Sequence, residues 1–235
     1  MTSPGPVFGS LLIFDGLLAL LTSIIVLRKD SDSKINQFVS LALFFFGLYF
    51  IPEGLIYSLP LEYQEYFEPL IDITLGASLL AGTVIAIAGL YIWMGEGFLE
   101  LRKRIIFIII VGISAIFGAT LNSNLVYDPV EDLLTIEGNV IYIISLFVIN
   151  LVFISFAIYG FSSTLMTLDK SDPIYLKLLF FILSLLTIIG GMVYYSLIET
   201  IARREGFLGI IGHIFYTGAC LMLLYAFVLK DVRKE

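Results

Sequence analysis

The chain has 235 residues, of which 59% are hydrophobic and 14% charged, and its mean hydropathy is +1.02. This composition excludes an ordinary soluble domain and leaves room for several spanning helices of about 20 apolar residues each. The formal charge of −7 says little about partners, because acidic and basic residues are segregated into different links. The single cysteine, Cys220, excludes an intrachain disulfide. The single histidine, His213, excludes a haem with two histidine ligands.

Seven apolar runs predict an all-α fold in which residues 1–235 form one seven-helix transmembrane domain. The predicted spans are residues 8–27, 38–57, 70–94, 105–121, 139–161, 174–198 and 207–229. A secretory signal has a basic segment before its apolar run, and this chain has none before its first apolar run. We therefore interpret that run as a retained helix.

Three of these spans carry features that affect helix packing or bending. The second contains Pro52 before Gly54, and proline is expected to kink the helix there. The third places small residues at every fourth position, Ser78, Gly82 and Ala86, and this spacing lets helices approach closely in lipid. The sixth contains Gly190 and Gly191, a predicted bend. Pro52, Gly54, Gly190 and Gly191 are therefore the candidate hinges.

The longest predicted link, residues 122–138, is acidic and contains Asp128-Pro129, a turn signal. It is expected to form a short hairpin or a short helix over the bundle.

Lysine and arginine lie mainly in the first, third and fifth links and in the C-terminal tail, whereas the N-terminus and the second and fourth links have none. Only the sixth link, with Arg203 and Arg204, breaks the pattern. The positive-inside rule therefore predicts a cell-membrane protein with its N-terminus outside and its C-terminus in the cytoplasm.

Ionisable residues inside the predicted spans fall at similar depth. With the orientation above, all four lie in the outer half of the bundle: Asp15, Glu53, Asp72 and His213. Tyrosines lie near the same depth: Tyr49, Tyr57, Tyr194 and Tyr216. A charge at mid-bilayer costs roughly 2.5–3.5 kcal/mol, so such residues rarely face lipid.

Two interpretations of these residues stay open. Each group can satisfy local backbone or cap a helix, or together they can line one polar pocket that opens to the outside. No lysine or arginine shares their depth, so the acids are either protonated through desolvation or await a proton, a metal ion or a cationic ligand.

When the sequence of the second span is aligned with that of the sixth at a constant offset, Gly54 pairs with Gly191 and Tyr57 pairs with Tyr194. This indicates a possible three-plus-one-plus-three repeat, in which two parallel helix triplets flank the fourth span.

Several function classes are not expected from these residues. Microbial rhodopsins share the seven-helix plan but need a lysine in the middle of the last helix, and here Lys230 lies at its cytoplasmic end, so covalent retinal is not expected. No nucleotide motif, nucleophile–base pairing or metal cluster is evident, so we expect no enzyme, no cofactor, no metal and no nucleic-acid partner.

Three hypotheses remain open: a sensor or receptor module with a cytoplasmic partner, a small proton- or cation-coupled transporter or channel, and a non-catalytic subunit of a membrane complex. The sequence leaves open whether the chain is part of a longer protein.

Overall fold

The computed structural model describes residues 5–60, 63, 66–95, 123–128, 133–138, 140–201 and 207–228. Within these residues it contains six long helices: α1 (Gly5–Lys29), α2 (Lys34–Ser58), α3 (Phe67–Met94), α5 (Val140–Leu165), α6 (Pro173–Ile201) and α7 (Phe207–Val228). All six are long and apolar enough to cross a membrane. Six of the seven predicted spans therefore form helices, whereas the predicted fourth span, residues 105–121, lies outside the described residues.

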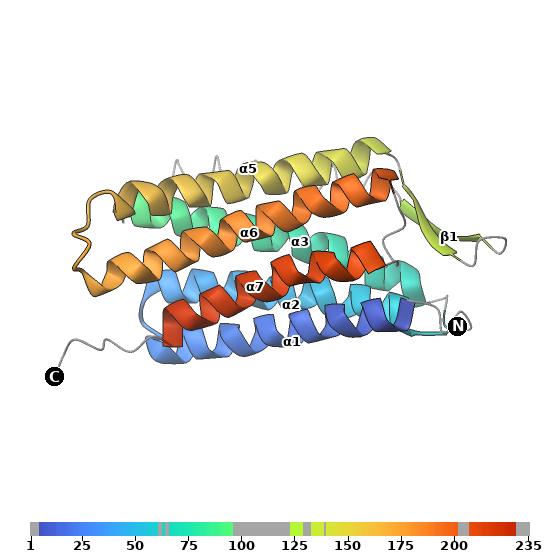
Figure 1. The fold of residues 1–235 in the computed structure, drawn as a ribbon, viewed down its shortest axis with the longest axis horizontal. Helices are drawn as coiled ribbons and strands as arrows, with labels where there is room; N and C mark the ends of the chain where they lie inside the picture. Colours follow the sequence, from blue (N-terminus) through green and yellow to red (C-terminus); the bar gives the residue numbers. More distant parts are fainter. Residues whose placement is uncertain are drawn as a thin grey trace.

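The helices lie roughly parallel to one long axis, with the two chain termini at opposite ends of the bundle (Figure 1). α1, α3, α5 and α7 run from the N-terminal end towards the other end, and α2 and α6 run back. Each described helix contacts the next one along the chain, and α7 returns to contact α1, which closes the ring. The first and last described helices are consequently neighbours.

Local sequence signals explain where several of these helices begin and end. The Ser33 hydroxyl accepts a hydrogen bond from the Asn36 amide at 3.4 Å and caps α2. Asp172 accepts from the Ile174 amide at 2.8 Å, just where Pro173 opens α6. Gly95, with φ of +65°, ends α3 in a conformation that favours glycine.

α1 and α2 pack closely through three layers of small residues. The facing pairs are Gly9 with Gly54, Gly16 with Gly47, and Ser23 with Ser40. A Cβ atom added to Gly54 would lie 2.6 Å from the Gly9 carbonyl oxygen, so the two backbones nearly touch. In the third layer the Ser23 hydroxyl donates to the Ser40 carbonyl at 2.7 Å, and the Ser40 hydroxyl donates to the Ser23 carbonyl at 2.9 Å.

α3 approaches α5 in the same way, through the predicted stripe of small residues. The Asn150 amide donates to the Ser78 hydroxyl at 3.1 Å, and a Cβ atom on Gly82 would collide with the Asn150 carboxamide oxygen. Further along, Gly89 and Gly160 bring the two backbones into direct contact. The prediction that this stripe allows close helix approach is confirmed.

The predicted link between the fourth and fifth spans forms an antiparallel hairpin, β1 (Ser123–Asp128) with β2 (Leu133–Gly138). The hairpin lies at the N-terminal end of the bundle (Figure 1). Of the two alternatives predicted for this link, the hairpin is confirmed, and the described membrane bundle itself is all-α, as predicted. A sheet with open edges can form here because the segment lies beyond the long apolar helices, where water can satisfy its edges.

The predicted hinges lie inside continuous helices. α2 runs through Pro52 and Gly54, and α6 runs through Gly190 and Gly191. The two glycines of α6 pack against aromatic side chains of α7. A Cβ atom added to Gly191 would lie 3.1 Å from the Phe215 side chain, so only a glycine fits without displacing it.

The proposed repeat pairs Gly54 with Gly191, but these residues face different neighbours. Gly54 packs against α1, which precedes its own helix, whereas Gly191 packs against α7, which follows its own helix. The helix directions in Figure 1 agree with two parallel triplets. Both the repeat and the hinges stay predictions.

Candidate functional site

A buried polar cluster joins α1 to α7 in the half of the bundle nearest the N-terminus. Asp15 of α1 is fully buried, with 0% of its surface exposed. Its Oδ2 atom lies 2.8 Å from Nδ1 of His213, and the Thr217 hydroxyl donates a hydrogen bond to its Oδ1 atom. His213 and Thr217 are four residues apart and therefore lie on the same face of α7. One carboxyl group thus binds two side chains of the opposite helix.

The histidine is bound through one of its two ring nitrogens. Nδ1 of His213 shares a hydrogen bond with Oδ2 of Asp15, in which the donor is set by the tautomer of the ring. Nε2 is buried and has no hydrogen-bond partner among the described residues.

Two aromatic rings contact this imidazole, and two further rings pack against those two. The Phe8 ring of α1 meets it edge-on at 4.9 Å, and the Tyr195 ring of α6 lies at 6.1 Å. Tyr57 of α2 packs edge-on against Phe8 at 4.9 Å, and Tyr216 stacks on Tyr195 at 5.6 Å. The polar cluster is therefore packed against aromatic rings and is buried, and burial strengthens electrostatic interactions inside it.

The structure brings together some of the predicted pocket residues and separates others. Asp15 and His213 form a hydrogen bond, and Tyr57 and Tyr216 belong to the aromatic shell just described. Asp72, near the start of α3, has an exposed side chain and is not part of the cluster.

Three further predicted residues are half-buried. Glu53 of α2, with Oε2 buried, directly precedes the glycine that packs on the first turns of α1. Tyr49 packs against Phe50 at 4.7 Å, and Tyr194 packs against Phe215 at 5.5 Å. On α6, the ring that packs against the imidazole is Tyr195, which follows the predicted Tyr194.

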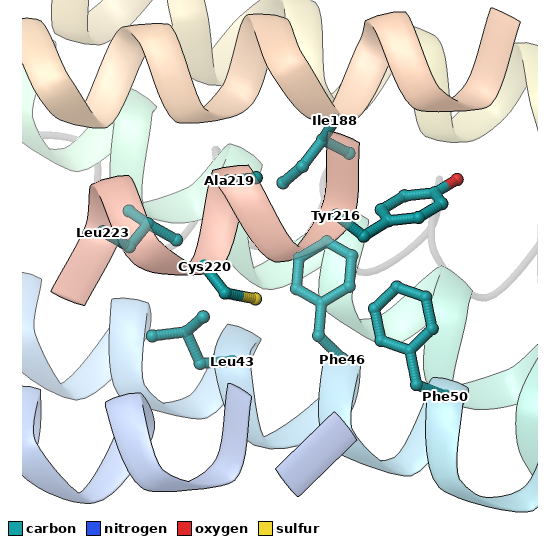
Figure 2. A pocket seen from close by; sticks show the side chains of 8 residues that line it. All are labelled: Leu43, Phe46, Phe50, Ile188, Tyr216, Ala219, Cys220 and Leu223. Carbon is teal, nitrogen blue, oxygen red and sulfur yellow. The ribbon is translucent and has the colours of Figure 1, made fainter. Parts of the chain in front are cut away.

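A small apolar pocket lies between α2, α6 and α7 (Figure 2). Its lining consists of Leu43, Phe46, Phe50, Ile188, Tyr216, Ala219, Cys220 and Leu223. Tyr216 is the member that it shares with the predicted site, and none of Asp15, Glu53, Asp72 or His213 lines it. The part of the chain that the structure describes contains no group of three metal-binding side chains.

The predicted site did not include three contributors to this cluster: Thr217, Phe8 and Tyr195. The spacing of Thr217 does indicate it, because Thr217 follows His213 by one helical turn and lies on the same face. Phe8 and Tyr195 carry no such signal, since aromatic residues are frequent throughout these apolar spans. Only the packing of α1 and α6 against α7 identifies them.

The fold and the site together define a multi-pass helical membrane protein. The outer face of α1 shows the apolar stripe expected of a lipid-facing surface, with Phe14, Leu17, Leu21 and Ile24 at least half exposed. The opposite face carries the buried Asp15. No family model, curated protein or solved structure matches the chain.

Proposed function

We propose that this protein is a sensor module of the cell membrane, which binds a small ligand or cation at the Asp15–His213 cluster and signals to a cytoplasmic protein partner. The observation that carries the proposal is the fully buried Asp15 carboxyl group, which binds two side chains of α7. Ionisable groups at membrane depth are costly and are usually kept for function.

The cluster is positioned to couple the two ends of the bundle. A ligand that competes for the oxygens of Asp15 would loosen α1 from α7. At the other end of the same pair, the Lys29 ammonium donates to the Phe227 carbonyl at 2.5 Å, where it also meets the negative end of the α7 dipole. Movement of α7 at the site would therefore disturb this second contact, next to the C-terminal tail.

The proposal includes seven spans, with the N-terminus outside. The distribution of basic residues supports this orientation. The described chain leaves α3 at the C-terminal end of the bundle and reappears in β1 at the N-terminal end (Figure 1). We propose that the predicted fourth span, residues 105–121, makes the additional crossing between these two points, so that the hairpin and the N-terminus lie on one side of the membrane. The parallel repeat is an optional part of the proposal and is not needed for the mechanism.

Ligand binding can be tested on the purified protein in lipid nanodiscs. Sodium, potassium, magnesium and calcium ions are titrated while thermal unfolding is followed, because a ligand that binds only the folded protein raises Tm. We expect one of these cations to raise Tm in the wild type and not in Asp15→Asn. Equal Tm changes in both proteins would contradict binding at this site.

The second half of the proposal concerns the partner. Proximity labelling from a C-terminal fusion should enrich a cytoplasmic signalling protein, and disruption of the Lys29 contact by Lys29→Met should change its labelling. If labelling recovers only proteins that a control membrane protein also recovers, the sensor function is contradicted.

A transporter or channel for protons or cations is the second candidate, and one observation favours it. Polar groups continue past Asp15 towards the C-terminal end, as Thr22 and the Ser23–Ser40 pair. Proteoliposome flux of protons or sodium that is abolished in Asp15→Asn and Glu53→Gln would establish transport. A role as a non-catalytic subunit would instead be indicated by stable co-purification with other membrane proteins.

A further inference from the structure

We propose that α6 and α7 form one rigid unit that moves as a whole against a larger unit made of α1, α2, α3 and α5, and that the apolar pocket between the two units permits this movement. The inference rests on the proposed sensor function and deepens it, because it names the part of the bundle that responds at the Asp15–His213 cluster. The contacts inside each unit differ in kind from the contacts across the boundary between them.

Close backbone contacts and apolar packing hold the four helices of the larger unit together. Gly54 lets α2 touch the backbone of α1, and Gly89 meets Gly160 in the same way between α3 and α5. α2 and α3 are close neighbours, and the fully buried Phe67 at the start of α3 belongs to one apolar cluster with Ile56 of α2. Helices in such close contact cannot shift past one another without collision, so these four are expected to move together.

α6 and α7 are joined to each other at two levels along their length. The Ser184 hydroxyl of α6 donates a hydrogen bond to the Ala219 carbonyl of α7 at 2.9 Å, and both residues are buried. Nearer the N-terminal end of the bundle, a Cβ atom added to Gly212 of α7 would lie 2.5 Å from the Tyr195 ring of α6. A buried hydrogen bond and close ring packing therefore make this helix pair a unit of its own.

Contacts across the boundary are made by individual side chains at separate points. The Asp15 cluster and the Lys29–Phe227 contact join α1 to α7 at the two ends of that pair. The Phe161 ring of α5 packs against Phe181 of α6 at 4.4 Å. Among the described helices, no glycine has its nearest neighbours across this boundary, so close backbone contact of the kind found inside the larger unit does not reinforce it.

The apolar pocket lies on this boundary (Figure 2). Leu43, Phe46 and Phe50 line it from α2, and its other lining residues belong to α6 and α7. The Phe50 ring meets the Tyr216 ring of α7 edge-on at 5.0 Å. Side chains beside an unfilled space lose part of their dispersion contacts, so the units attract each other less here than at a filled boundary. The same space lets side chains of α7 shift towards α2 without collision.

The chain enters the smaller unit from the larger one through a single link, residues 166–172 between α5 and α6. This link lies at the C-terminal end of the bundle, whereas the Asp15 cluster lies in the opposite half (Figure 1). Loss of the Asp15 contacts therefore releases the smaller unit far from its attachment, where a given rotation produces the largest displacement. Rotation of a packed element about a short link is an established form of conformational change.

Distances between pairs of spin labels, measured on the full-length protein in nanodiscs, test this division. Phe14→Cys on α1 with Ile214→Cys on α7 reports the boundary. Val193→Cys with Ile214→Cys reports the smaller unit, and Phe14→Cys with Ile73→Cys on α3 reports the larger one. All four positions are at least 42% exposed, and Cys220→Ser removes the buried native thiol while keeping its size.

Weakening the Asp15 cluster should move one unit against the other. We expect Asp15→Asn to change the boundary distance by roughly 2 Å and to leave the distances inside both units unchanged. Thr217→Val removes one of the two contacts of Asp15, so it should produce a smaller change of the same sign and serves where Asp15→Asn does not fold. A similar change inside the smaller unit shows that α7 moves alone and overturns the inference, and so does a constant boundary distance in both variants.

Filling the pocket tests its part in the movement. Cys220→Leu, used in place of Cys220→Ser, adds apolar volume to the pocket and should reduce the change at the boundary by about twofold or more. Ser155→Leu is the control, because it adds similar volume on the exposed face of α5 and should leave that change as it is. An undiminished change in Cys220→Leu, or an equal reduction in Ser155→Leu, overturns the role of the pocket.

The inference and the sensor function fail in different ways. If the smaller unit moves as a whole in Asp15→Asn while no cation changes Tm, the two-unit movement is supported and cation binding at the cluster is contradicted. If a cation raises Tm only in the wild type but α7 moves without α6, the binding site is supported and the two-unit movement is overturned.

Discussion

At the residue scale, the stability of the α1–α7 contact depends on a pair whose members cannot be removed independently. Nδ1 of His213 and the Thr217 hydroxyl both form hydrogen bonds with Asp15, which has no exposed surface. Removing the carboxyl group leaves both side chains without this partner inside the aromatic shell. Removing all three groups would leave no such unpaired group, so the individual substitutions are expected to be non-additive.

Asp15→Leu should lower the free energy of unfolding by about 1–3 kcal/mol, because a buried donor without a partner retains its desolvation cost. Asp15→Asn should lower it by less, since the carboxamide oxygen can still accept one hydrogen bond. The double variant Asp15→Leu with His213→Leu should be more stable than the sum of the single changes predicts. SDS or steric-trap unfolding measures these values, and strict additivity would contradict a direct coupling.

The Asn150 contact gives a second residue-scale prediction. Asn150→Leu removes the hydrogen bond to Ser78 and places a branched side chain where Gly82 leaves room only for the amide. We expect a loss of about 0.6–2 kcal/mol, the range for hydrogen bonds between membrane helices. The matched control is Ser155→Ala on the same helix, because exposed Ser155 bonds only to its own helix at Leu151. An equal loss in the control would contradict the interpretation.

At the element scale, two helix pairs of this bundle, α1–α2 and α3–α5, are joined by small residues that let the backbones approach. The α1–α2 layers recur every seven residues, at Gly9, Gly16 and Ser23 on one helix and at Ser40, Gly47 and Gly54 on the other. Seven residues correspond to about two helical turns, so the layers stay on one face. In lipid, where apolar burial does not drive helix association, such close contact supplies much of the attraction.

Gly54→Ala should destabilise the protein by about 1–3 kcal/mol, because the added Cβ atom would meet the Gly9 carbonyl oxygen at 2.6 Å and force the backbones apart. Gly76→Ala and Gly218→Ala are matched controls, since a Cβ atom at either position meets nothing within 4 Å. The controls should leave stability unchanged or raise it by up to about 1 kcal/mol. Similar losses in all three variants, measured by thermal unfolding, would refute this explanation.

At the scale of the whole molecule, the ring of helices places the polar cluster between the first and the last described helix. The cluster lies towards the N-terminal end, and the Lys29–Phe227 contact lies at the opposite end of the same pair. If the N-terminus is outside, the buried cluster lies nearer the exterior and the Lys29–Phe227 contact lies nearer the cytoplasm. The proposed direction of signalling therefore depends on the orientation of the bundle.

Cysteine labelling tests this orientation directly. Tyr63 and Met166 are 42% and 82% exposed at opposite ends of the bundle, and native Cys220 is buried, so the wild type should react little. On intact cells, a membrane-impermeant maleimide should label Tyr63→Cys at once and Met166→Cys only after permeabilisation. The reverse pattern would place the N-terminus in the cytoplasm and overturn the sidedness of the site.

Apolar length and residue size are local properties, so they predicted the six described spans, the hairpin as one of two alternatives and the small-residue stripe of α3. The rise along each helix also placed Asp15 and His213 at similar depth. Local patterns could not predict that these two residues meet, that Thr217 joins them or that Asp72 stays exposed. Contact requires two helices to be neighbours and to face each other, and this depends on how all the helices pack together.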